Sequence, residues 1–210
     1  TYGISADDFL AQAKASNYVS DYPFLEGAYN DSLEGYLYPK TYSFQDDPTA
    51  DEVIRAMLDQ FETETAGLNL TDGANGLTAQ QIVTMASLIE RESSVESERS
   101  TIASVIYNRL DEGMPLQIDA AIVYARGGGS GTVTYDDLEI DSPYNVYQNT
   151  GLTPGPICSP SVSSIQAALN PDDTNYLYYV LSSAGDGSHK FSETYDEFQA
   201  NVQEYRDSQS

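Results

Sequence analysis

The sequence is poor in residues on which several functions depend. Only nine of its 210 residues are Lys or Arg, against 33 Asp or Glu, and the net charge is −24. Binding to nucleic acid needs clustered basic side chains that contact phosphates, so nucleic acid is excluded as a partner, and anionic membrane surfaces are disfavoured. No apolar run approaches the ~20 residues that span a bilayer, and no signal peptide opens the chain.

Histidine and cysteine each occur once, and tryptophan does not occur. The single Cys158 forms no intramolecular disulfide, and its neighbourhood PGPICSP has no histidine, which favours a buried apolar role over a nucleophilic one. One histidine, His189, and one cysteine do not make up a metal site. Without tryptophan, the aromatic faces that a polysaccharide needs would have to come from tyrosine.

The segment from Thr78 to Gly113 is typical of two consecutive helices with a serine-rich break between them. Thr78 and Gln81 form a capping-box pattern, and apolar residues then recur at helical spacing. Short hydroxyl side chains compete for backbone hydrogen bonds and interrupt the first helix, and Ser97 suits the start of the second. The second helix is predicted to end at Gly113.

Two glutamates lie at the end of the first of these helices. At about 100° per residue, Glu92 falls roughly 50° from the centre of the apolar arc and Glu90 more than about 100° from it, so Glu92 should be the more buried. Burial and the negative end of the helix dipole both raise the pKa of a carboxyl group, which makes Glu92 a candidate general acid. The alternative is that Glu92 flanks the core and pairs with Arg91, Arg99 or Arg109.

The remaining pattern predicts an α+β fold. We expect a short helix capped by Ser5, helices over 51–68 and 162–169, a hairpin of NYLYYVLS and HKFS, and a final helix from Thr194 to Tyr205. In the hairpin, His189 is either adjacent to a cleft or a solvent-facing strand residue.

Two segments with extended character carry further polar candidates. In LEGYLYPKTY, Pro39 favours a strand or an extended edge segment. Glu34 at its entrance is either a second carboxylate of a cleft or a buried anchor that accepts backbone hydrogen bonds. In MPLQID, Gln117 and Asp119 alternate with apolar residues, so their side chains would project from one side of a strand. An ordinary exposed strand face would show the same pattern.

The segment DSPYNVY, residues 141–147, is predicted to form a turn that carries Tyr144, Asn145 and Tyr147. Polysaccharide clefts combine planar apolar faces with hydrogen-bonding groups, and a tyrosine supplies both. On residue type alone, a position in the core or on the surface is the simpler interpretation of these tyrosines.

Several of these motifs, in this order, resemble one family. ASLIERESS, ASVIYNRLDEGMPLQIDAAIVYARG and SPYNVYQNTGLTPGPICSP are similar to the MltG-type endolytic lytic transglycosylases, the YceG-like family of murein-cleaving enzymes, and LEGYLYPKTYSF and YLYYVLSSAGDGSHKFSETYDEF extend the resemblance from about Ser32 to Tyr205. It implies a mainly helical, lysozyme-like catalytic core with a small β-hairpin over residues 31–210. Residues 1–30 would be the remnant of an N-terminal LysM-like subdomain or a linker.

The resemblance also implies a mechanism, because the second glutamate of the family's E-x-E pair, its acid/base, corresponds to Glu92. Glu92 would protonate the oxygen between MurNAc and GlcNAc and then deprotonate the MurNAc C6 hydroxyl, which closes a 1,6-anhydro ring. This attack gains the entropic advantage of an intramolecular reaction, and no metal or organic cofactor is implied. The implied substrate-binding residues are Glu34, Gln117, Asp119, Tyr144, Asn145, Tyr147 and His189.

Two alternatives stay open at this point. One is a muramidase that uses water, with Asp119 or Glu34 as the second carboxylate. The other is an inactive glycan-binding or scaffold module. By resemblance, the partners would be peptidoglycan strands and the penicillin-binding proteins that synthesise them. A preceding membrane anchor would hold the catalytic part on the extracytoplasmic side of a bacterial cell membrane.

Overall fold

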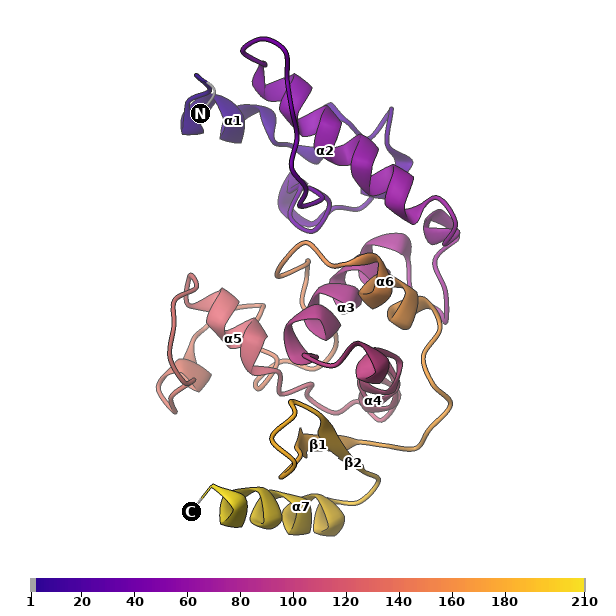
Figure 1. Cartoon of the computed structure of the whole chain (residues 1–210), viewed down its shortest axis with the longest axis vertical. Helices are drawn as coiled ribbons and strands as arrows, with labels where there is room; N and C mark the ends of the chain where they lie inside the picture. The colour runs from indigo at the N-terminus through magenta and orange to yellow at the C-terminus, as the bar shows by residue number, and fades with distance from the viewer. Residues whose placement is uncertain (1–2, 210) are drawn as a thin grey trace.

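The computed structural model describes residues 3–209 and shows an elongated arrangement of helices with a small sheet near one end (Figure 1). Within that range the chain has seven α-helices and one two-stranded antiparallel sheet, so the α+β prediction is confirmed. The helices are α1 (Ala6–Gln12), α2 (Ala50–Thr65), α3 (Ala79–Glu92), α4 (Arg99–Asp111), α5 (Asp119–Ala125), α6 (Val162–Leu169) and α7 (Tyr195–Ser208), and the strands are β1 (Tyr178–Leu181) and β2 (His189–Ser192).

Helix α3 is the central core element. Its predicted capping box is present, because the Thr78 hydroxyl accepts from the Gln81 amide while the Gln81 side chain accepts from the Thr78 amide. Every residue from Ile82 to Ile89 is buried, since α6 and α4 pack against the helix (Figure 1). Fully burying an aliphatic side chain contributes about 1.5–3 kcal/mol, so this stretch fixes the position of the residues that follow it.

The break between α3 and α4 differs slightly from the prediction. Ser93 leaves the helical conformation and its hydroxyl donates to the Val95 carbonyl oxygen at 2.6 Å. A single 3₁₀ turn over Glu96–Glu98 then precedes α4, so Ser97 is not the N-cap and α4 begins at Arg99. The turn redirects the chain, and no side chain caps α4.

The N-terminal part packs against α2. Helix α2 starts at a capping box of Thr49 and Glu52 and buries Ile54, Leu58 and Phe61. The ring of Phe24 lies 5.0 Å from that of Phe61, centroid to centroid, so the first thirty residues contribute to the same hydrophobic cluster as α2. The division near residue 30, the LysM-like remnant and the lysozyme-like core stay predictions.

Neither of the two segments with extended character forms a strand. Residues 33–42 are turns and irregular coil, and residues 114–118 are coil that leads into α5 at Asp119. Leu116 and Ile118 are buried, as the predicted alternation requires, but Gln117 has a left-handed φ of 55°. The Gln117 amide donates to the Val146 carbonyl oxygen at 3.0 Å. Within residues 3–209 no strand pairs with this segment, so the alternation shows that one side of the segment is buried and not that it belongs to a β-sheet.

The C-terminal hairpin matches the prediction. Strands β1 and β2 pair antiparallel with Tyr179 opposite Phe191 and Leu181 opposite His189. Helix α7 follows from the predicted capping box at Thr194 and packs on the hairpin (Figure 1). Across residues 3–209, no helix combines the length and the apolar character that crossing a bilayer requires.

Candidate active site

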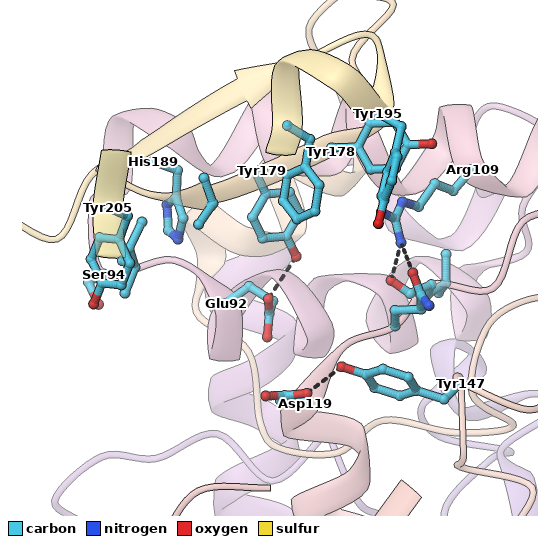
Figure 2. Close-up of a pocket in the computed structure, with 15 residues that line it drawn as sticks. Glu92, Ser94, Arg109, Asp119, Tyr147, Tyr178, Tyr179, His189, Tyr195 and Tyr205 are labelled. Carbon is cyan, nitrogen blue, oxygen red and sulfur yellow. Dashed lines mark hydrogen bonds between the residues drawn. The ribbon is translucent and has the colours of Figure 1, made fainter. Parts of the chain in front are cut away.

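A cavity of about 630 Å³ opens where the end of α3, the start of α5 and the β-hairpin meet (Figure 2). These elements bring together residues that are far apart in the sequence. Of the predicted site residues, the cavity is lined by Glu92, Gln117, Asp119, Tyr147 and His189. The structure adds Arg109, Tyr178 and Tyr179 to the polar lining.

Glu92 is the last residue of α3, and its carboxylate lies in the cavity below the ring of Tyr179 (Figure 2). The Tyr179 hydroxyl donates to Glu92 Oε2 at 2.7 Å. Burial raises the pKa of Glu92, and the charge of Asp119 acts in the same direction, against a smaller lowering by the Tyr179 hydrogen bond. The carboxyl group is therefore biased toward its protonated form.

The alternative role for Glu92, an ion pair with an arginine, is wrong. None of the ion pairs within residues 3–209 includes Glu92. Glu90 takes that role instead, because Arg99 Nη2 lies 3.6 Å from its Oε1 and the Ser161 and Ser164 hydroxyls donate to its Oε2. Burial would raise the pKa of Glu90, but these hydrogen bonds and the Arg99 charge outweigh it and lower the pKa. Two carboxyl groups two residues apart thus have opposite protonation tendencies.

Asp119 and Tyr147 form a second polar pair in the cavity. The Tyr147 hydroxyl donates to Asp119 Oδ1 at 2.5 Å (Figure 2). Burial and the neighbouring carboxylate of Asp119 raise the pKa of the Tyr147 phenol, so the phenol stays a donor. Asp119 is the first residue of α5. Gln117, two residues earlier, is exposed, and its side-chain oxygen lies 3.4 Å from Arg109 Nη1.

Arg109 fixes the hairpin to the segment that carries Gln117. Its guanidinium donates to the Leu177 carbonyl oxygen at 2.6 Å and to the Leu116 carbonyl oxygen at 2.8 Å. The residue is only 9% exposed, and an arginine buried this far needs such partners. Its planar guanidinium reaches several carbonyl groups at once and so joins two irregular backbone segments.

His189 lies beside this cavity and is oriented by a carboxylate. Its Nδ1 is 2.8 Å from Glu98 Oε2, and its backbone amide donates to Glu98 Oε1 at 2.9 Å. The imidazole ring meets the Tyr179 ring edge-to-face with centroids 5.4 Å apart. Since only 8% of the side chain is exposed, the alternative of a solvent-facing strand residue is wrong.

Three predicted substrate-binding residues lie outside this cavity. Asn145 is fully buried, and its amide donates to the Leu138 and Ile140 carbonyl oxygens at 2.9 Å each while accepting from the Tyr147 amide. The prediction that it contacts sugar directly is wrong, because every polar group of its side chain already has a protein partner. Glu34 and Tyr144 line a different, smaller cavity, so neither is placed next to Glu92.

The comparison with protein families gives a match to the YceG-like family over residues 2–204. This chain belongs to the YceG-like family. The matched range includes α3, α5 and the hairpin, and therefore both carboxylates that line the larger cavity.

Similar proteins include two endolytic murein transglycosylases. That of Bacillus subtilis (strain 168) is 48% identical over 155 residues, which make up 73% of this chain and 43% of that protein. That of Streptococcus pneumoniae serotype 2 is 35% identical over an alignment of 218 positions, which covers 96% of this chain and 39% of that protein. The chain thus spans about two fifths of the length of these relatives. A 2.6 Å crystal structure of a yceG-like protein from Listeria monocytogenes is 36% identical, with a TM-score of 0.83 over 93% of this chain and 67% of that one.

Tyr179 and Arg109 are among the residues of this YceG-like site that the sequence did not predict. Tyr179 is one of 17 tyrosines and lies in a strand, where residue type does not show which one faces a carboxylate. Arg109 was considered only as a partner of Glu92, whereas it binds backbone carbonyls. Cys158 is half-buried rather than fully buried; burial raises the pKa of its thiol to about 11, and its Sγ lies 3.4 Å from the Ser87 carbonyl oxygen.

Proposed function

We propose that this YceG-like chain contains the catalytic site of an endolytic lytic transglycosylase, which cleaves the bond between MurNAc and GlcNAc within murein strands. The observation that carries the proposal is the environment of Glu92, a carboxyl group that is desolvated, has no cationic partner within residues 3–209 and opens into the cavity. Two relatives named endolytic murein transglycosylase support it.

In the first step, protonated Glu92 donates its proton to the glycosidic oxygen. Tyr179 bonds Oε2, and no hydrogen bond to Oε1 is found within residues 3–209, so Oε1 is the oxygen that faces the substrate. The bond between MurNAc C1 and that oxygen then breaks and leaves positive charge on C1. The negative charge of Asp119, which lines the same cavity, would stabilise that charge.

In the second step, the Glu92 carboxylate accepts the proton of the MurNAc C6 hydroxyl as its oxygen bonds to C1. The product is a 1,6-anhydro ring, and Glu92 ends the cycle protonated, as it began. One carboxyl group suffices because the nucleophile belongs to the substrate and is already close to C1. Tyr147 and Gln117 line the same cavity and would orient the sugars.

Hydrolysis is the second candidate, because one observation favours it. Asp119 shares the cavity with Glu92, and a muramidase that uses water needs a second carboxylate as base or nucleophile. Glu34 is not suited to that role, since it lines another cavity. Asp119 Oδ1 already accepts the Tyr147 hydroxyl and is not free to bind a water, which leaves transglycosylation the better supported reaction.

The substrate and its surroundings follow from this proposal. A murein-cleaving enzyme works in the cell wall, so we expect this chain to act on the extracytoplasmic side, held there by a membrane anchor outside it. Penicillin-binding proteins, which synthesise the strands, are the expected protein partners.

Digestion of purified murein, followed by mass spectrometry of the products, tests the proposal. Anhydro ends support transglycosylation, reducing ends support hydrolysis, and strands of unchanged length contradict both. The Glu92→Gln variant should lose cleavage by at least about a thousandfold, because the side chain keeps its shape but has no proton to transfer. Glu112→Gln, at an exposed position after α4, is the matched control and should cleave at the parent rate.

A further inference from the structure

A second cavity of about 200 Å³ lies apart from the one that holds Glu92, and the two share no lining residue. It lies between residues 29–36, α5 and the loop around Pro156. Pockets that enclose drug-sized ligands run to roughly 300–1,000 Å³, so this one suits a single small group. Tyr124, Tyr144 and Glu34 line it together with Tyr29.

Glu34 is the only charged residue among those that line this cavity. Within residues 3–209, no hydrogen bond or ion pair reaches its side chain, although burial raises the pKa of the carboxyl group. Its backbone is held in place, because the Glu34 amide donates to the Ser32 hydroxyl at 3.0 Å. Glu34 itself is exposed to solvent, so its carboxylate is accessible to a ligand, and no protein group within the described residues supplies it with a counter-charge.

Three tyrosine rings surround the rest of the cavity. The Tyr144 ring lies 4.8 Å from that of Tyr124 and 6.2 Å from that of Tyr29, centroid to centroid, the second pair being edge-to-face. Aromatic faces attract cations through their quadrupoles, by about 0.5–2 kcal/mol. A carboxylate that lines the same cavity as three tyrosine rings is an arrangement that recognises an organic cation better than a neutral sugar.

The wall of the cavity is closely packed. A Cβ at Gly155 would come within 3.1 Å of the Tyr144 hydroxyl and 3.2 Å of the Tyr29 side chain. Gly35, with a φ of 90°, leaves no room for a Cβ either, since one would come within 2.6 Å of Pro156. The glycine that follows Glu34 therefore lets the loop around Pro156 close against it.

We propose that this second cavity binds a primary alkylammonium group, with Glu34 as its counter-ion and the rings of Tyr29, Tyr124 and Tyr144 around it. The proposal rests on the proposed function, because in murein such groups belong to amino-acid side chains of the peptides attached to the glycan. The cavity would then select strands by their peptides, while Glu92 acts on the sugars.

Two segments link this cavity to the one that holds Glu92. Helix α5 carries Asp119 in the larger cavity and Tyr124 in the smaller, five residues or about 7.5 Å apart along the helix axis. Tyr147 and Tyr144 come from one turn, and Tyr147 lines the larger cavity while Tyr144 lines the smaller. A glycan with its attached peptide can therefore contact both at once.

Titration of the ¹⁵N-labelled chain with Nα-acetyl-L-lysine-N-methylamide, followed by NMR, tests binding without any catalysis. We expect saturable shifts of the Glu34, Gly35 and Gly155 amides. The Nε-acetylated probe, which has no positive charge, should bind at least tenfold more weakly. Equal binding of the two probes, or no shift with either, would overturn the proposal, and binding of N-acetylglucosamine alone would make the cavity a sugar site instead.

Variants separate charge from ring contacts. Glu34→Gln should weaken binding of the lysine probe at least tenfold, and Glu62→Gln, at an exposed position on α2, should leave it unchanged. Tyr144→Phe keeps the ring and should bind as the parent does, whereas Tyr144→Leu should bind several times more weakly. Spectra of each variant show whether the fold is intact. Parent-like binding by Glu34→Gln contradicts the assignment.

Digestion extends the test to the polymer. The parent chain should cleave murein whose free amines have been acetylated several times more slowly than untreated murein. The Glu34→Gln variant should cleave the two substrates at equal rates. Glu92→Gln should cleave neither. If the chain cleaves nothing at all, the proposed function fails while the NMR titration still decides whether the second cavity binds an ammonium group.

Discussion

Replacing Tyr179 by phenylalanine removes the hydroxyl that donates to Glu92 and keeps the ring that packs against His189. A hydrogen bond to a charged group contributes about 1.5–3 kcal/mol, and it stabilises the carboxylate over the carboxylic acid. Without it, Glu92 holds its proton more firmly. The variant therefore tests how the structure sets the protonation of the proposed acid.

The assay is the pH dependence of kcat/KM for murein cleavage. The first step needs protonated Glu92, so the rate falls as pH rises through the pKa of Glu92. Since 1.36 kcal/mol corresponds to one pH unit, Tyr179→Phe should move this alkaline limb up by about one to two pH units. The maximum rate should fall as well, because the carboxylate loses the contact that fixes its orientation.

Other groups near Glu92 do not produce this change. The Asp119 charge raises the pKa of Glu92 and the His189 charge lowers it, and both stay in place in the variant. The Tyr179 phenol has a pKa well above its usual range, chiefly through burial, so it does not titrate in the assay. Tyr176→Phe, a neighbouring residue outside the cavity, is the control. A limb that stays in place, or moves down, would refute the reasoning.

Two further predictions concern stability. Burial raises the folded-state pKa of Glu92, so the stability that the protonated side chain contributes is fully present below the unfolded pKa and is lost as pH rises through the folded value. Glu92→Gln should therefore be more stable than the parent at pH 7 and not at pH 3. Urea unfolding at both pH values checks this, and an equal difference in the free energy of unfolding at the two pH values would contradict it. Asn145→Ala removes the side-chain partner of the Ile140 carbonyl oxygen and of the Tyr147 amide and should lower the free energy of unfolding by about 2–4 kcal/mol, measured in the same way, with Asn149→Ala, at an exposed position, as the milder comparison.

Local patterns predicted those elements that local interactions define. The capping boxes and apolar spacing located α3 and α7, and α6 has the predicted bounds, 162–169. The greater burial of the cavity glutamate also followed from helical periodicity, because α3 is regular up to Glu92. In a helix, the direction in which a side chain points follows from the position of its residue in the sequence.

Outside helices, position in the sequence does not fix the direction of a side chain, and the predictions for such segments failed. Residues 114–118 alternate like a strand but are held by the guanidinium of Arg109, a contact that periodicity does not contain. Tyr144 and Tyr147 were treated as one set, yet they come from a turn that sends them into separate cavities. Pairing of Tyr179 with Glu92 depends on how the hairpin docks on the helices, and this is decided only by the whole fold.

The hydrogen bond between Glu92 and Tyr179 spans 87 positions of the chain. During translation, Glu92 emerges from the ribosome long before Tyr179, so the nascent polypeptide lacks this hydrogen bond until the hairpin has folded onto α3. A product that ends before β1 would therefore lack the contact that holds the proposed acid in place.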